Sequence, residues 1–241
     1  QPILQGHLFC PRFMPNIVKH VLLAGASGLT GGQLLQLLLA DHDIERVTAL
    51  VRTPLPVSHP KLQQQVIDFS TLEARRELVQ ADAVFCCLGT TMRQAGSQAH
   101  FKTVDYFYPL TLAMLAKMNG VKRFAAISSL GANADSGNFY LQVKGQLERA
   151  LQALDFEQLV VVRPSLLLGE RKQFRAAERL GIAAGKLVAP LLCGPLQRYR
   201  PIAAEAVAWN LLNAVVHDGP GRHTLESAQL AARYEQARCT H

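Results

Sequence analysis

The chain has 241 residues, of which 49% are hydrophobic and 18% are charged, a composition typical of one large globular domain or two small ones that excludes extensive disorder. No apolar run reaches the ~18 residues of a membrane-spanning helix, so we expect no membrane span. The formal net charge is +7, but the basic residues lie among apolar ones without an aromatic-and-basic motif. We therefore expect phosphate-bearing small molecules as partners, and no nucleic acid.

The first pattern along the chain is an apolar run, a glycine-rich turn and a leucine-rich stretch. Residues 20–24 predict a strand and residues 32–40 a helix, with the sequence Gly25-Ala26-Ser27-Gly28-Leu29-Thr30-Gly31 between them. Gly25 permits a tight turn, Gly28 lets a phosphate approach the backbone, and Gly31 lets helix and strand pack closely. The N–H groups of the first helical turn then face the phosphates. This context predicts dinucleotide binding.

The remaining elements alternate between strand and helix. Residues 83–88 are almost entirely apolar, as expected of a strand buried on both faces. The alternation predicts an α/β Rossmann fold, with a doubly wound parallel sheet and helices on both faces. Further strands are predicted at 46–52, 65–68, 123–129, 158–163 and 222–225, and helices at 71–80, 101–119, 139–154 and 203–216.

The two ends of the chain differ in character from its middle. Residues 1–13 contain two prolines and lack periodicity, and we interpret them as an N-terminal extension or leader. Residues 14–241 are predicted to form a single Rossmann domain. Within it, residues 165–200 and 218–241 are expected to add a small cap near the carboxyl ends of the strands, where ligands bind in such sheets.

The cysteines and histidines indicate neither a disulfide framework nor a metal site. The five cysteines are odd in number and form no CxxC pair, and Cys86 and Cys87 stand within an apolar run, so reduced thiols and a cytoplasmic location are expected. The eight histidines lack the spacing of a motif such as HExxH, and we expect no metal.

Two polar residues follow predicted strands where a nucleotide would lie. Arg52 ends the second strand, at a position where proteins that bind NAD usually carry an acidic residue for the ribose hydroxyls. Because a guanidinium grips a phosphate with two charge-assisted bonds, Arg52 favours NADP over NAD; the alternative is a solvated arginine. Asp68 is equally well interpreted as a hydrogen-bond acceptor for the adenine amino group or as a loop cap.

A second constellation lies at the predicted helix 139–154. Tyr140 and Lys144 are four residues apart and share a helical face, where the ammonium favours the phenolate form of the tyrosine. Such a tyrosine can exchange a proton with a substrate oxygen while hydride moves to or from the nicotinamide. Lys144 can also bond the nicotinamide ribose. Ser128 or Ser129, at the end of the preceding strand, can hold the substrate oxygen.

These motifs, in this order, resemble those of atypical or extended short-chain dehydrogenases/reductases. Within that family they are most similar to the oxidoreductase-like branch of Tat-interactive protein 2. The resemblance covers about residues 21–216. The segments that carry it are the glycine turn, Cys86-Cys87-Leu88-Gly89-Thr90-Thr91, Val104-Asp105, Ser128-Ser129-Leu130-Gly131-Ala132, Tyr140-Leu141-Gln142-Val143-Lys144-Gly145 and Arg163-Pro164.

The resemblance implies a role for each matching residue. The pyrophosphate would be lined by Gly25, Ser27, Gly28, Leu29, Thr30 and Gly31. Arg52 would take the 2′-phosphate, Leu88, Gly89 and Thr90 would lie along the cofactor, and Pro164, Ser165 and Leu166 would reach the nicotinamide end. Ser128 or Ser129, Tyr140 and Lys144 would form the catalytic group. One departure is Leu88-Gly89-Thr90-Thr91 in place of the classical Asn-Ala-Gly loop, which leaves the proton-relay asparagine unassigned.

The sequence therefore predicts an NADP(H)-dependent oxidoreductase that acts on a carbonyl or alcohol. Two alternatives stay open, a non-catalytic NADP(H)-binding regulator that acts through a protein partner and an enzyme that uses a bound nicotinamide internally. The resemblance also implies that the helices at 101–119 and 139–154 are candidates for a homodimer face.

Overall fold

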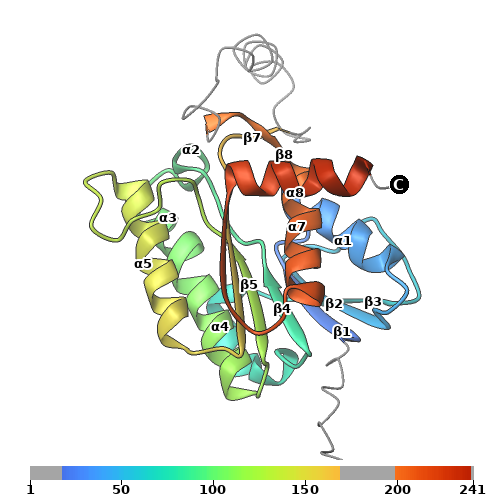
Figure 1. The fold of residues 1–241 in the computed structure, drawn as a ribbon. Helices are drawn as coiled ribbons and strands as arrows, with labels where there is room; N and C mark the ends of the chain where they lie inside the picture. The colour runs from blue at the N-terminus through green and yellow to red at the C-terminus, as the bar shows by residue number, and fades with distance from the viewer. Residues whose placement is uncertain (1–17, 169–198, 240–241) are drawn as a thin grey trace, which may run out of the picture.

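The computed structural model describes residues 18–168 and 199–239, which form a parallel sheet covered by helices on both faces (Figure 1). Seven strands are hydrogen-bonded in the order β3-β2-β1-β4-β5-β6-β9, and every pair is parallel. The order reverses between β1 and β4, the point at which ligands bind in such sheets. The strands are β1 (His20–Ala24), β2 (Arg46–Val51), β3 (Leu62–Val66), β4 (Ala83–Cys86), β5 (Arg123–Ile127), β6 (Gln158–Arg163) and β9 (Gly221–Glu226). The predicted fold class is confirmed.

Two core clusters, one on each face, hold the helices to the sheet. Successive side chains of a strand point to opposite faces, so the adjacent, fully buried Leu22 and Leu23 belong to different clusters. Each buried leucine contributes ~1.5–3 kcal/mol. The cluster of Leu23 includes side chains of α1 (Leu29–Ala40) and α7 (Ala204–His217), and that of Leu22 includes side chains of α4 (Tyr108–Met118), α5 (Phe139–Ala153) and the 3₁₀ segment η1 (Phe69–Leu78).

The predicted helix at 101–119 is divided into three parts. It consists of α3 (Gln98–Lys102), a π-helical turn η2 (Thr103–Phe107) and α4. A short helix, α2 (Met92–Ala95), precedes it and ends at Gly96, which has a φ of 71°. Helical periodicity alone does not reveal a π turn, because one turn of different pitch leaves the apolar pattern on either side intact.

Other boundaries differ for local reasons. The helix predicted from residue 32 begins at Leu29, so the glycine turn supplies its first residues. The strand predicted at 65–68 is β3, which starts at Leu62; its three consecutive glutamines suit an edge strand and conceal it from a search for apolar runs. Asp68, the last residue of the predicted strand, lies outside β3 and caps η1 by accepting a hydrogen bond from the Ser70 N–H. Helix α8 (Ser227–Cys239), not predicted as a helix, buries only Ser227 and Leu230.

The segments predicted to form a cap are described only in part. In 165–200, the short strand β7 (Leu167–Leu168) pairs with β8 (Ile202–Ala203), and residues 169–198 lie outside the described residues. In 218–241, β9 extends the main sheet beside β6 and α8 packs against α7 and β9. Residues 1–13, predicted as a leader, also lie outside the described residues.

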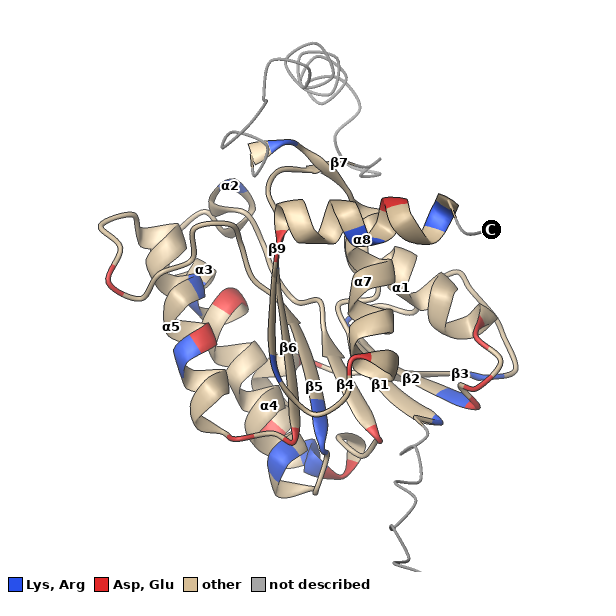
Figure 2. Cartoon of the chain, viewed as in Figure 1, with Lys and Arg blue, Asp and Glu red and all other residues tan. Residues whose placement is uncertain are grey.

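The charged residues of the described chain are mixed in sign. Figure 2 shows acidic and basic residues close together on α5, on α8 and at the amino-terminal end of the sheet. Lys19 pairs with Glu45 at 2.6 Å and Lys122 with Glu157 at 3.3 Å. Much of the excess positive charge falls in 169–198, which holds Arg171, Lys172, Arg175, Arg179, Lys186 and Arg198 against Glu170 and Glu178.

Candidate functional site

The glycine turn after β1 is held tightly against the end of β4. Gly25 has a φ of +89°, and a Cβ there would lie 2.4 Å from the Cys87 carbonyl oxygen. A Cβ on Gly31 would lie 2.1 Å from the Gly25 carbonyl oxygen. Because both contacts are with backbone, any side chain would displace the turn or α1. Gly28 is the N-cap of α1 and places no side chain over the first helical N–H groups.

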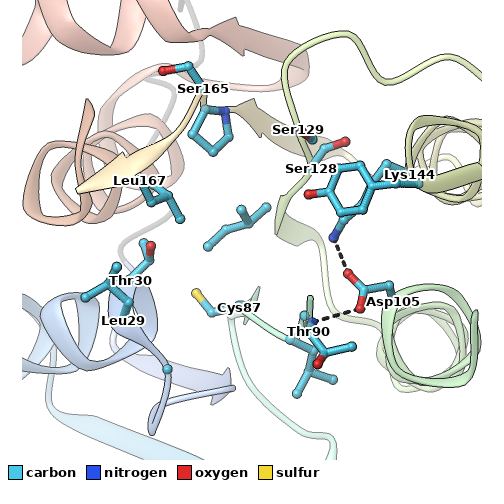
Figure 3. A pocket seen from close by; sticks show the side chains of 16 residues that line it. Leu29, Thr30, Cys87, Thr90, Asp105, Ser128, Ser129, Lys144, Ser165 and Leu167 are labelled. Carbon is cyan, nitrogen blue, oxygen red and sulfur yellow. Dashed lines mark hydrogen bonds and ion pairs between the residues drawn. The ribbon is translucent and has the colours of Figure 1, made fainter. Parts of the chain in front are cut away.

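A cleft opens beside this turn at the carboxyl ends of β1, β4, β5 and β6 (Figure 3). In Figure 3, Leu29, Thr30 and Leu167 lie on one side, and Ser128, Ser129 and Lys144 on the other. The lining residues are Gly28, Leu29, Thr30, Cys87, Leu88, Gly89, Thr90, Asp105, Ile127, Ser128, Ser129, Tyr140, Lys144, Pro164, Ser165 and Leu167. The structure thus brings the predicted catalytic group and the predicted pyrophosphate turn to one cavity.

Tyr140 and Lys144 come from the first turns of α5. Asn138 caps this helix by accepting a hydrogen bond from the Leu141 N–H at 3.2 Å. Tyr140 is half-buried, and its ring centroid lies 5.4 Å from that of Phe101. The next residue after Lys144, Gly145, lets α5 approach the preceding loop, because a Cβ there would lie 2.2 Å from the backbone nitrogen of Ala134.

Lys144 is buried and forms an ion pair with a carboxylate that is also buried. Its Nζ lies 2.7 Å from Asp105 Oδ1, with side-chain exposures of 5% and 1%. The largest influence on the Lys144 pKa is burial, which lowers it, but attraction to Asp105 and Tyr140 outweighs burial and leaves the pKa above its usual value. The ammonium is therefore charged at neutral pH and lies in the cleft wall.

Two hydroxyls of the cleft are buried without a protein partner. Ser128 Oγ and Thr30 Oγ1 belong to residues that are 5% and 4% exposed, and neither has a hydrogen-bond partner in the described structure. Buried polar groups are normally satisfied, so such hydroxyls indicate a ligand or water. With the side-chain-free turn at Gly28, they fit a polar phosphate-bearing cofactor. The Ser129 Oγ lies 3.5 Å from the Leu130 carbonyl oxygen.

Several predicted cofactor residues lie behind or beside the cleft. Gly25 and Gly31 shape the turn from behind, and Ser27 is exposed in it. Arg52 is exposed at the carboxyl end of β2, next to the strand that leads into the turn, and Leu166 is 65% exposed. None of these residues, nor Asp68, is part of the cleft lining.

The sequence motifs did not assign a role to four residues of the cleft. Asp105, Cys87, Ile127 and Leu167 line it. The available signal for Asp105 was a carboxylate in an otherwise apolar helical stretch. Burial raises the pKa of the Cys87 thiol and, to about 11, that of Cys86, so both thiols are neutral at pH 7. Ser165 also lines the cleft, and its Oγ donates a hydrogen bond to the Arg200 carbonyl oxygen and accepts one from the Ser227 hydroxyl.

The described residues contain no group of three or more His, Cys, Asp or Glu that could hold a metal ion. In the same part of the chain, every helix is too short or too polar to cross a membrane.

Comparison with known proteins identifies the family of the chain. The sequence model of a family described as NAD(P)H-binding matches residues 25–183. Protein HTATIP2 from Rattus norvegicus is 37% identical over 211 residues, which cover 86% of this chain and 85% of that protein. The mitochondrial protein FMP52 of Candida albicans is 34% identical over 156 residues, covering 63% of this chain and 68% of the relative.

Solved structures share the fold at low sequence identity. The Bordetella bronchiseptica enzyme WbmH in complex with NAD+ superposes with a TM-score of 0.67 at 18% identity, over 90% of this chain and 79% of the other. The UDP-glucose 4-epimerase of Thermotoga maritima, solved with UDP-glucose, gives 0.67 at 14% identity, over 90% and 80%.

The predicted cytoplasmic location is contradicted by these comparisons. Several relatives, from Candida albicans to Aspergillus clavatus, are named as mitochondrial proteins. The prediction rested on reduced thiols, and free cysteines do not distinguish the cytosol from another reducing compartment.

The matched family model, the identity to HTATIP2 and the shared fold lead to one assignment. The chain belongs to the family described as NAD(P)H-binding and is a relative of HTATIP2.

Proposed function

We propose that this chain is an NADP(H)-dependent oxidoreductase that moves hydride between the cofactor and a carbonyl or alcohol substrate. The observation that carries the proposal is the meeting, in one cleft, of the glycine turn with Ser128, Ser129, Tyr140 and Lys144. These groups come from β1–α1, the end of β5 and α5, so only the folded sheet brings them together.

Different parts of the site have separate tasks. The N–H groups at the start of α1 and the Thr30 hydroxyl would hold the pyrophosphate, and Arg52 would bind the 2′-phosphate. Leu88, Gly89 and Thr90 would lie along the cofactor, with Pro164, Ser165 and Leu166 towards its nicotinamide end. Asp68 is the least suited of the predicted residues, because one of its carboxylate oxygens already caps η1.

The nicotinamide would supply the hydride, and the protein would control the proton. The unpartnered Ser128 Oγ is the better placed of the two serines to hold the substrate oxygen, since the Ser129 hydroxyl is near a carbonyl of its own loop. The Tyr140 hydroxyl would exchange a proton with that oxygen, and the charged Lys144 would stabilise the phenolate left on Tyr140.

The direct test is consumption of NADPH or reduction of NADP by the purified chain over a panel of aldehydes, ketones and alcohols. We expect turnover with at least one class and a preference for NADP(H) over NAD(H). Cofactor binding with no consumption over the whole panel would contradict the enzymatic proposal.

That negative outcome would support a second candidate, a non-catalytic NADP(H)-binding regulator that acts through a protein partner. One observation favours it: the ammonium of Lys144 already has a buried carboxylate partner at 2.7 Å, so its charge is compensated without a substrate.

Replacing Arg52 by Ala is expected to weaken NADP(H) binding by roughly 10- to 100-fold, since charge-assisted bonds are worth ~1.5–3 kcal/mol. NAD(H) affinity is expected to change little, because NAD lacks the 2′-phosphate. Isothermal titration with both cofactors measures this. The matched control is Arg46→Ala, which removes a guanidinium from the opposite end of β2, where it contacts His20 Nδ1. Equal losses for NADP(H) and NAD(H) in Arg52→Ala would refute the assignment.

A further inference from the structure

The strongest unassigned feature is the buried carboxylate of Asp105, which lies on the π-helical turn η2. This turn interrupts the helical stretch from Gln98 to Met118. π-helical turns are rare and occur frequently at functional sites. Here it directs Asp105, a residue with 0% exposure, towards the cleft (Figure 3).

The two oxygens of this carboxylate bind two different walls of the cleft. Oδ1 lies 2.7 Å from Lys144 Nζ on α5, and Oδ2 accepts a hydrogen bond of 2.8 Å from the Thr90 N–H in the loop after β4. The backbone of the adjacent Gly89 packs directly beside the pair, since a Cβ there would lie 3.4 Å from Asp105 Oδ1 and 3.8 Å from Lys144 Nζ. One side chain thus joins η2, α5 and this loop.

Stability alone is a weak reason for this arrangement. Both charges are almost fully withdrawn from water, and replacing a buried ion pair by apolar side chains is often neutral or stabilising. Such a replacement would, however, no longer hold the Lys144 ammonium and the Thr90 N–H in place at the edge of the cleft.

We propose that Asp105 is a positioning residue that fixes the Lys144 ammonium and the Thr90 amide, and thereby sets α5 and the loop after β4 at the spacing the cofactor requires. Asp105 acts through Lys144 and does not contact the reacting atoms. The role in cofactor binding rests on the proposed function. The contact of Asp105 with Lys144 can be tested without measuring turnover.

Asp105 also favours the charged form of Lys144. The titratable groups that face the ammonium are Asp105 from η2, Tyr140 from α5 and Cys86 from β4. Burial raises the pKa of Cys86 to about 11, so its thiol is neutral at pH 7. Among these neighbours, Asp105 is the one whose carboxylate lies within ion-pair distance of the ammonium, at 2.7 Å. Without it, burial would favour the neutral amine.

The test replaces Asp105 by Asn, which keeps an oxygen for the Thr90 N–H and removes the negative charge. Titration of Lys144 by NMR of ¹³C-dimethylated lysines should show its pKa lowered by at least about one pH unit. NADPH affinity should be measured between pH 7 and 10. As the pH rises, the variant should lose affinity at a lower pH than the wild type, because its Lys144 loses its proton earlier.

The matched control is Glu148→Gln. Glu148 is also buried, lies one turn further along α5, and pairs with Arg163 at 2.6 Å, but it is not part of the cleft. This variant removes a buried carboxylate from the same helix and should leave the Lys144 titration unchanged. An unchanged titration in Asp105→Asn, or an equal shift in both variants, would overturn the proposal.

A second measurement covers the case in which Asp105→Asn folds poorly. Unfolding by urea of the wild type, Asp105→Asn, Lys144→Met and the double variant forms a double-mutant cycle. If Asp105 holds Lys144, the double variant should be more stable than the sum of the single changes predicts. Additive losses would overturn the linkage. A wild-type chain that reduces no carbonyl would contradict the proposed function and leave both of these results interpretable.

Discussion

Tyr140→Phe is expected to lower NADPH-dependent carbonyl reduction by roughly 100- to 10,000-fold, the usual contribution of a general acid or base. The substitution removes only the hydroxyl, so the ring can keep its contact with Phe101 at 5.4 Å and α5 should be undisturbed. The dissociation constant for NADPH should change little. Stopped-flow measurement of NADPH oxidation at saturating cofactor checks the expected loss.

Tyr108→Phe is the control for this experiment. Tyr108 is also half-buried and packs its ring on Phe69 at 5.8 Å, but it lies outside the cleft. Its activity should remain close to that of the wild type. Full activity in Tyr140→Phe would remove this tyrosine from the proton path, whereas loss of NADPH binding would assign it to the cofactor instead.

Gly31→Ala is expected to abolish measurable NADP(H) binding at concentrations that saturate the wild type. The added methyl group would lie 2.1 Å from the Gly25 carbonyl oxygen and 3.2 Å from Cys87 Cβ. Because the first contact is with backbone, α1 or the turn must move. The N–H groups at the start of α1 would then no longer point towards the phosphates. Titration of intrinsic NADPH fluorescence and thermal unfolding measure the two consequences.

The neighbouring glycine supplies the control. A Cβ on Gly32 would lie 3.5 Å from the Ala26 carbonyl oxygen, an ordinary contact. Since Ala favours a helix over Gly by ~1 kcal/mol, Gly32→Ala should bind NADPH normally and unfold at an equal or higher temperature. Equal cofactor affinity in Gly31→Ala and Gly32→Ala would show that cofactor binding does not depend on close packing at the turn.

The sequence predicted the fold well because the strongest patterns were long and regular. Five buried strands are apolar or nearly so, and the glycine turn joins a strand to a helix as predicted, although that helix begins at Leu29, inside the turn. The sequence placed the start of β3 at residue 65 instead of Leu62, because polar glutamines occupy this edge strand. It missed α8, whose few buried residues give little amphipathic signal. Both elements are held mainly by packing and pairing with neighbouring elements, β3 with β2 and α8 with α7, and not by an apolar pattern of their own.

The candidate site was predictable in its residue types and less so in its contacts. Tyr140, Lys144 and the two serines meet in the cleft because their spacing reflects helix and strand geometry. The partner of Lys144 could not be inferred, since Asp105 lies 39 positions earlier and reaches it by a π-helical turn. No local pattern specifies how two helices are set against each other.

The cleft collects side chains and backbone from the ends of β1, β4, β5 and β6, which span residues 20–163. Contacts between such distant parts of a chain require long loops to close, so this cavity exists only once the sheet has been assembled. A partly folded chain would then lack the cavity altogether. A ligand that binds only the complete fold stabilises it by RT ln(1 + [L]/Kd). Cellular supply of the dinucleotide would thereby regulate how long each molecule survives before degradation, in addition to any chemistry it performs.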